Sequence, residues 1–460
     1  MYLLPLSLVL VAAAYAAVAI SATPLNAPRY SSSPPSGSSS SSSTLNTDVS
    51  EYNFDDSGYT YCQAPFPSKD SYTAIPDAEV ELVQLVVRHG DRTTEHILPN
   101  EDTTWTCDGV EDDMYLHGAQ QPKQNTTGSV KQVIIIPEWN KKYGYSNQIW
   151  KGSCESGQLT DRGKSQHRFL GSQLRGIYVD KLGFLPSKLE DLASVYVRTT
   201  YYWRTKNSVE SLLGGLWPNR GYSSDDAIPL HSLPQRIEDL YGNSDACPKV
   251  DDLYNQIIGS SHFLDFLKEE KPLMTKLNSN FGEEGGDWTS NWNNQVDVLL
   301  PRHCHGMKLP CNSPNKDCPT DADVAQAMRN GHYQYAYTYR DNPLAHNFTR
   351  LSIGSFLGTL NEQRQAHIAG KSSKVKLAIY SAHDTSIAPI LGVLKASNRS
   401  MLWPPYASNI AFELWKKKDG SRVIRVIHNG HTLKIMPGNR FNEYIQNYIP
   451  QNITAECAAK

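Results

Sequence analysis

The six residues Arg88-His89-Gly90-Asp91-Arg92-Thr93 place a histidine between two arginines, directly after the apolar run 80–87. Fixed guanidinium charges disfavour the positive form of an imidazole, while their forked N–H donors bind phosphate. The sequence therefore predicts a neutral His89 beside a phosphate group. Gly90 favours this interpretation, because a residue without a side chain lets the backbone approach a ligand closely. The alternative is structural, since arginine and histidine are also common where a strand returns to water.

Two more short strands are predicted to end in polar residues. The run 193–197 ends at Arg198-Thr199-Thr200, and the run 375–380 ends at Ser381-Ala382-His383-Asp384-Thr385. Helix-like patterns follow both segments. In open α/β sheets, ligands bind in the crevice outside the carboxyl ends of parallel strands, so we expect the three segments to converge there.

These residue types fit chemistry on a phosphomonoester. The phosphate dianion needs cationic donors that bind it and hold the charge of its equatorial oxygens. The candidates are Arg88, Arg92, Arg198 and His383. The neutral imidazole of His89 can attack phosphorus, and Asp384 can protonate the departing alkoxide. A structural alternative for Asp384 is the N-cap of the helix that follows. Because His89 has to be neutral while Asp384 carries a proton, we expect a mildly acidic pH optimum.

Three separated blocks resemble the histidine acid phosphatases, branch 2 of the histidine phosphatase superfamily. Residues 88–92 are similar to the family's Arg-His-Gly-x-Arg block, residues 198–200 to its Arg-Ser-Thr block, and residues 380–385 to its Tyr-Ser-Ala-His-Asp-Thr block. The resemblance implies that His89 is the nucleophile, that Asp384 is the proton donor and that the four cationic candidates surround the phosphate. At Thr94 the chain departs from the family pattern, in which a proline often follows the first block.

Shorter motifs are similar to the animal 2-phosphoxylose phosphatase branch of this family. They are Cys304-His305-Gly306, Leu309-Pro310-Cys311, Phe412-Glu413-Leu414-Trp415 and the run 154–160. This similarity adds a phosphosugar to the candidate substrates, which also include phytate-like polyphosphates and unselective phosphomonoesters. No cofactor is expected.

The strand pattern and the resemblance together predict an α/β fold. We expect a mostly parallel sheet flanked by helices, phosphoglycerate mutase-like, with an inserted helical cap over the phosphate site. Residues 75–234 and 374–460 are predicted to form the catalytic core, and residues 235–373 the mainly helical cap. Ahead of the core, the apolar residues 1–22 are typical of a signal peptide, with a signal anchor as the alternative. The serine-rich residues 23–60 are typical of a flexible linker.

Composition indicates an extracytosolic protein. The 460 residues carry a net charge of −3, which offers no general affinity for nucleic acid. The eight cysteines predict disulfides in an oxidising compartment. The alternative is zinc held by three residues, His303, Cys304 and His305, together with Cys311 and Cys318, but the secretory context favours disulfides and no metal.

The protein is expected to be secreted or to lie in the secretory pathway, in the extracellular space, the cell wall or the Golgi lumen, without a membrane attachment once the leader is cleaved. Four sequons predict N-glycans at Asn125, Asn347, Asn398 and Asn452. The alternative function is that of a catalytically inactive cell-surface protein of the same fold, which binds phosphate.

Two residues near the motifs have open roles. Trp203 is either a substrate contact or a packing residue. Asp91 is expected to orient the neighbouring arginines through a charge-assisted hydrogen bond.

Overall fold

The structure, a computed structural model, describes residues 59–99, 101–107, 150–218, 228–283, 288, 291–312, 316–370 and 374–458. The predicted signal peptide, all of the predicted linker before Tyr59, and Asn125 lie outside the described residues.

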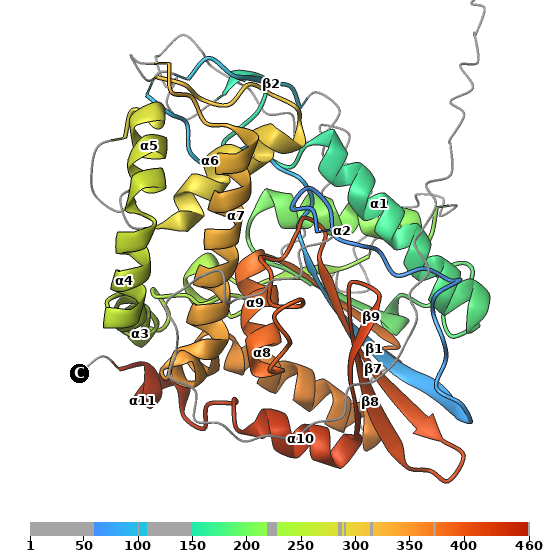
Figure 1. The fold of residues 1–460 in the computed structure, drawn as a ribbon. Helices are drawn as coiled ribbons and strands as arrows, with labels where there is room; N and C mark the ends of the chain where they lie inside the picture. The colour runs from blue at the N-terminus through green and yellow to red at the C-terminus, as the bar shows by residue number, and fades with distance from the viewer. Residues whose placement is uncertain are drawn as a thin grey trace, which may run out of the picture. The chain divides into compact units, whose positions relative to one another are not determined.

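A seven-stranded sheet forms the centre of the protein (Figure 1). Its strands, in spatial order, are β5 (Leu230–Ser232), β4 (Val195–Thr199), β6 (Leu377–Ala382), β1 (Ala78–Arg88), β7 (Asn409–Lys417), β8 (Arg422–His428) and β9 (His431–Pro437). The pairings from β5 to β1 are parallel, and those from β1 to β9 are antiparallel. β1 therefore lies where the parallel half of the sheet meets the antiparallel half.

The alternating side chains of β1 enter two different cores. Leu82 and Val86 pack into one core, whereas Val83, Leu85 and Val87 pack into the other. This follows from the twofold period of a strand, which sends successive side chains to opposite faces of the sheet. Because both faces of the sheet are covered here, most residues of the strand from Val80 to Val87 are apolar.

Two helices cover the face that carries Val83, Leu85 and Val87. They are α1 (Asp161–Arg175) and α2 (Trp203–Leu216), which contribute the core residues Leu170, Leu174, Val209, Leu212 and Leu216. Thr160 caps α1, because its Oγ1 accepts the N–H of Gly163 at 3.2 Å. Figure 1 shows the two helices packed side by side.

Among the described residues, the remaining α-helices all follow residue 248. They are α3 (Lys249–Ile258), α4 (Ser261–Glu269), α5 (Lys271–Phe281), α6 (Trp292–Cys304), α7 (Asp321–Ala336), α8 (Ala345–Ile368), α9 (Asp384–Val393), α10 (Gly438–Gln446) and α11 (Ile453–Cys457). α8 lies inside the predicted cap range, yet it packs against strand β1 of the sheet and against helix α9, which lies in the predicted core range. The division into core and cap stays a prediction.

Shorter elements complete the described part of the chain. π-Helical turns span Gly176–Lys181 and Tyr337–Asp341, and 3₁₀ turns span Leu192–Ser194 and Gln235–Ile237. The two-residue strands β2 (Thr104–Trp105) and β3 (Lys151–Gly152) pair in parallel away from the main sheet. None of the helices that the structure describes combines the length and the apolar character needed to cross a bilayer.

All eight cysteines form disulfides, as the sequence predicts. The pairs are Cys62–Cys304, Cys107–Cys154, Cys247–Cys457 and Cys311–Cys318. Cys304, Cys311 and Cys318, the cysteines considered as zinc ligands, thus form disulfides, and the alternative of a zinc site at residues 303–318 is wrong.

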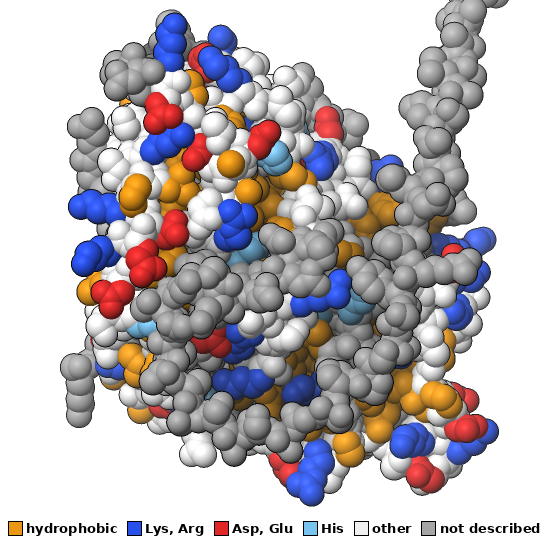
Figure 2. Space-filling view, viewed as in Figure 1, with side chains coloured by type: hydrophobic (Ala, Val, Ile, Leu, Met, Phe, Trp, Pro, Cys, Tyr) orange, Lys and Arg blue, Asp and Glu red, His pale blue; other side chains and the backbone are white. Residues whose placement is uncertain are grey.

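Figure 2 shows acidic and basic side chains interspersed over one face of the molecule.

Candidate active site

The site lies at the carboxyl ends of the parallel strands β1 and β6. Arg88 ends β1 and is paired with Ala382 of β6, and the backbone N–H of His89 donates to the Ala382 carbonyl at 2.9 Å. His383 directly follows β6 and precedes α9. The rings of His89 and His383 consequently lie close together, with centroids 5.6 Å apart and an edge-to-face angle of 69°. The structure thus brings together the first and third of the predicted segments.

His89 is held in a single tautomer. Its side chain is 2% exposed, and its Nδ1 lies 2.8 Å from the Gly90 carbonyl oxygen. Because a carbonyl only accepts, Nδ1 carries the hydrogen and Nε2 keeps its lone pair. Burial, together with the charges of Arg88 and Arg204, holds the pKa of His89 well below its usual range. The imidazole is therefore neutral, as predicted.

Gly90 has a different role from the one expected. A Cβ atom built on Gly90 would lie 2.5 Å from the carbonyl oxygen of Gly163. Glycine is thus required because the loop after β1 lies very close to the first turn of α1. The close contact is within the protein and not between its backbone and a ligand. Packing of α1 against this loop fixes the backbone that carries His89.

Asp384 and Arg88 form a buried ion pair. Arg88 Nη2 lies 2.8 Å from Asp384 Oδ2, and the indole Nε1–H of Trp403 donates to the same oxygen at 2.9 Å. Burial alone would raise the pKa of Asp384, but the charge of Arg88 and the Trp403 hydrogen bond outweigh it and lower this pKa below its usual range. Asp384 is therefore a carboxylate. The helix N-cap is His383, so the N-cap alternative for Asp384 is wrong.

His383 lies among polar and aromatic groups. Its Nε2 lies 2.9 Å from Thr200 Oγ1, and the rings of Tyr202 and Tyr241 meet the imidazole edge-on at 5.4 and 5.5 Å. Burial and the charge of Arg204 hold the pKa of His383 well below its usual range. His383 is therefore a neutral hydrogen-bonding group rather than a cation.

Arg92 and Arg204 share one acidic partner. Arg204 Nη2 lies 2.8 Å from Glu95 Oε1, and Arg92 Nη2 lies 3.9 Å from the same atom. Arg92 also binds Asp297 Oδ1 through Nη1 at 2.7 Å, which ties the loop after β1 to α6. The charges of Arg92 and Arg204 both act on the pKa of His89. Both guanidinium groups thus belong to the site.

The predicted Arg198 has other partners. Its Nη2 lies 2.5 Å from both Glu238 Oε1 and Asp239 Oδ1. The charge of Arg204, in the first turn of α2, lowers the pKa of both His89 and His383, as do the charges of Arg88 and Arg92. These contacts favour Arg204 over Arg198 as the third arginine of the site. Sequence reasoning missed Arg204, although the start of a helix right after the strand at 193–197 was a usable signal.

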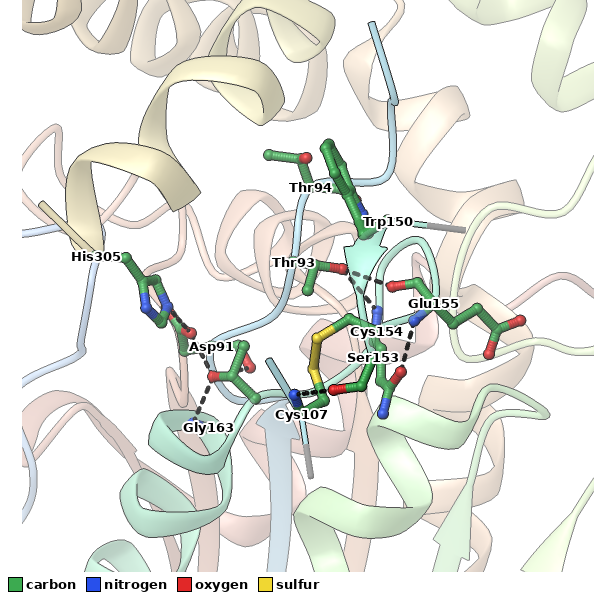
Figure 3. Close-up of a disulfide and its surroundings, with 12 residues drawn as sticks. Asp91, Thr93, Thr94, Cys107, Trp150, Ser153, Cys154, Glu155, Gly163 and His305 are labelled. Atoms are coloured by element: carbon green, nitrogen blue, oxygen red, sulfur yellow. Dashed lines mark hydrogen bonds and ion pairs between the residues drawn. A yellow bond between two sulfur atoms is a disulfide. The ribbon is translucent and has the colours of Figure 1, made fainter. Parts of the chain in front are cut away.

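Asp91 does not orient the arginines, contrary to expectation. Its Oδ1 accepts from Thr160 Oγ1 at 2.5 Å and lies 2.6 Å from His305 Nε2, as Figure 3 shows for the Asp91–His305 pair near the Cys107–Cys154 disulfide. Asp91 therefore joins the start of α1 to the end of α6.

Trp203 is not a core residue. Its side chain is 43% exposed, and Lys206 Nζ lies 4.9 Å from the centroid of its ring.

Fold and site together define an α/β protein in which two neutral histidines and three arginines meet at the carboxyl ends of parallel strands. The chain belongs to the histidine phosphatase superfamily, branch 2, whose family model matches residues 79–429. This confirms the family and the fold class predicted from the sequence, with the qualification that the sheet is parallel on one side of β1 and antiparallel on the other.

Individual relatives are distant but cover most of the chain. Counting factor 60 of Dictyostelium discoideum is 29% identical over 381 residues, which is 81% of this chain and 84% of that protein. Human 2-phosphoxylose phosphatase 1 is 25% identical and covers 80% of this chain and 75% of its own length. The solved structure of Hafnia alvei phytase in complex with tartrate matches with a TM-score of 0.54 at 15% identity, over 84% of this chain and 100% of the phytase, and shows the shared fold.

Proposed function

We propose that this protein is an acid phosphatase that hydrolyses phosphomonoesters through a phosphohistidine at His89. The observation that carries the proposal is the neutral His89 with a free Nε2 lone pair, surrounded by the guanidinium groups of Arg88, Arg92 and Arg204. A nucleophile without charge next to fixed cations is what attack on a phosphate dianion requires.

In the first step, His89 Nε2 forms a bond to phosphorus while the bond from phosphorus to the ester oxygen breaks. The three arginines and His383 bind the non-bridging oxygens and hold their charge through the transition state. Asp384 gives its proton to the departing oxygen, so the alcohol leaves neutral. In the second step, Asp384 takes a proton from water, the water oxygen bonds to phosphorus, and the bond between phosphorus and nitrogen breaks to release inorganic phosphate.

The proton on Asp384 has to come with the substrate. The pKa of Asp384 is lowered by Arg88 and Trp403, so the carboxyl is ionised at pH 5 before a substrate binds. A phosphomonoester has a second pKa of about 6, so at pH 5 it binds mainly as the monoanion with one proton left. Transfer of that proton to Asp384 leaves a phosphate dianion and a protonated acid. This origin of the proton makes the expected optimum acidic.

A phosphosugar is our preferred substrate class, since a related human protein is named 2-phosphoxylose phosphatase 1. The rings of Tyr202 and Tyr241 beside His383 offer apolar surface to a sugar. We place the protein in the secretory pathway, because four disulfides need an oxidising compartment. Asn347 and Asn452 are exposed and Asn398 is half-buried, and we keep N-glycans on these and on Asn125 as part of the proposal.

The test is turnover of p-nitrophenyl phosphate at pH 5 by the wild type, His89→Ala and Asp384→Asn, with inorganic phosphate release on phosphosugars as a second assay. We expect His89→Ala to lose activity by orders of magnitude. Asp384→Asn should lose far more activity on alkyl phosphates than on p-nitrophenyl phosphate, whose leaving group needs little protonation. A folded wild type that binds phosphate but turns over neither substrate class would favour the inactive phosphate-binding protein.

A further inference from the structure

A segment that precedes the sheet lies inside the candidate active site. Tyr61 is 3% exposed and Ala64 is 1% exposed. The backbone N–H of Ala64 donates to the Tyr406 carbonyl at 2.8 Å, and that of Tyr406 donates to the Tyr61 carbonyl at 3.1 Å. A disulfide joins Cys62 to Cys304 at the end of α6. We call residues 59–64 the strap.

The strap contacts both residues whose side chains bind Asp384 Oδ2. Arg88 Nη2 donates to Tyr61 Oη at 2.8 Å, and Tyr59 Oη donates to the Trp403 carbonyl at 2.8 Å. Arg88 and Trp403 are the donors to Asp384 Oδ2, at 2.8 and 2.9 Å. Each strap tyrosine therefore holds one of the two partners of the same carboxylate oxygen.

We propose that the strap is a positioning element for catalysis: Tyr61 and Tyr59 fix Arg88 and Trp403 against Asp384, and the Cys62–Cys304 disulfide keeps the strap in place. This inference rests on the proposed function, in which Asp384 is the proton donor. Tyr61 and Tyr59 act through Arg88 and Trp403, so they are positioning residues.

Geometry distinguishes the Tyr61 hydroxyl from the Tyr61 ring. The Arg88 guanidinium carbon lies 4.9 Å from the centroid of the Tyr61 ring and 4.6 Å from that of Tyr406, so two rings flank it. Tyr61→Phe keeps this ring contact and removes only the acceptor for Nη2. Its effect therefore reports on positioning by the hydroxyl.

Several other charged and titratable groups interact electrostatically with Asp384. Besides the two strap tyrosines they are Arg88, Arg92, Glu95, Arg204, Tyr335 and Tyr339. None of them is altered by Tyr61→Phe. A change in the titration of Asp384 in this variant consequently reflects a looser Arg88.

The first measurement compares Tyr61→Phe with the wild type on an alkyl phosphate and on p-nitrophenyl phosphate. We expect kcat on the alkyl phosphate to fall about tenfold, because its leaving group depends on Asp384, and kcat on p-nitrophenyl phosphate to change much less. Tyr178→Phe is the matched control, since the Tyr178 hydroxyl is buried and donates to Glu413 Oε1 at 2.7 Å in the other core. It should leave the ratio of the two kcat values unchanged.

A second measurement needs no turnover. The indole ¹⁵N–¹H resonance of Trp403, assigned with Trp403→Phe, reports protonation of Asp384 through their hydrogen bond. In Tyr61→Phe the titration midpoint of this resonance should move to higher pH, because Arg88 then stabilises the carboxylate less. An unchanged midpoint would overturn the proposed role of Tyr61. If the midpoint moves while no phosphomonoester is turned over, Tyr61 still positions Arg88 against Asp384, and the proposed function fails.

The disulfide is tested by removing it. Cys62→Ser combined with Cys304→Ser should shift the Trp403 midpoint in the same direction, and adding Tyr61→Phe should change little more, because both act through one contact. The control removes a disulfide that does not involve the strap, with Cys311→Ser and Cys318→Ser, and should leave the midpoint in place. Equal shifts in both disulfide variants would show a general loosening of the protein and contradict the specific role of the strap.

Discussion

Two arginines of one segment are expected to respond oppositely to the same substitution. Arg198→Ala should reduce stability and leave chemistry largely intact, whereas Arg204→Ala should reduce turnover and leave stability largely intact. The reason is their partners: Arg198 binds the carboxylates of Glu238 and Asp239, while Arg204 lies beside the two site histidines.

The stability loss follows from the burial of Glu238. Its side chain is fully buried and that of Arg198 is 7% exposed. Removing one partner of a buried ion pair costs about 3–5 kcal/mol. Glu238 keeps hydrogen bonds from the backbone N–H groups of Asp239 and Leu240, both at 3.0 Å, so the lower end, about 3 kcal/mol, is expected.

The sign of the pH dependence adds a check on this reasoning. Burial already raises the pKa of Glu238 while Arg198 is present. Without Arg198 this pKa rises further above that of the unfolded chain, so the folded variant binds more protons than the unfolded one. The variant therefore gains stability as pH falls through the folded pKa of Glu238. Its deficit should be smaller at pH 5 than at pH 7.

For Arg204→Ala we expect kcat/KM on p-nitrophenyl phosphate to fall about 100- to 1,000-fold, the usual loss when one preorganised donor to a transition-state oxygen is removed. Its partner Glu95 is 49% exposed and keeps Arg92 at 3.9 Å, so the unfolding midpoint should hardly change. The assays are steady-state kinetics and urea unfolding of both variants. A large loss of kcat/KM in Arg198→Ala with little loss in Arg204→Ala would refute the assignment and restore Arg198 as the third phosphate arginine.

Three further outcomes are expected. The pKa values of His89 and Asp384 are both lowered, so the fall of kcat/KM with rising pH should follow the second pKa of the phosphate ester. The midpoint of this fall should therefore differ between esters of different pKa, and a midpoint near pH 6.5 for all substrates would contradict the expectation. Glu95→Gln should lower the Kd for inorganic phosphate by titration calorimetry, since a carboxylate beside two site arginines competes with the ligand, and a weaker affinity would argue that Glu95 orients Arg92 instead. Glu413→Gln should lower the free energy of unfolding in urea by about 3–5 kcal/mol without changing kcat, because it leaves the buried charge of Arg425 unpaired. A loss below about 1 kcal/mol would show that this ion pair is not important for stability.

The local sequence was sufficient for the residues that directly follow a strand. Arg88 ends β1 and His89 follows it, and His383 with Asp384 follows β6, so a strand prediction alone places them at one edge of the sheet. The shape of the parallel half of the sheet also followed from the sequence, because the alternation of strand and helix patterns favours it. The antiparallel half did not follow as clearly, since a strand pattern carries no information about the direction of its partner.

What local pattern cannot decide is the direction of a side chain and its partner across long separations. Arg198 and Arg204 belong to one short segment, but only the fold shows that Arg198 meets Glu238 and Asp239 while Arg204 turns toward His89. Likewise, the Cys62–Cys304 pair spans a sequence separation of 242 residues. The sequence by itself determined the family, the nucleophile candidate and the presence of disulfides, because these depend on residue type and short spacing. The tertiary structure alone decided which arginines meet the histidines and which cysteine pairs with Cys62 of the strap, because those contacts depend on the packing of distant segments.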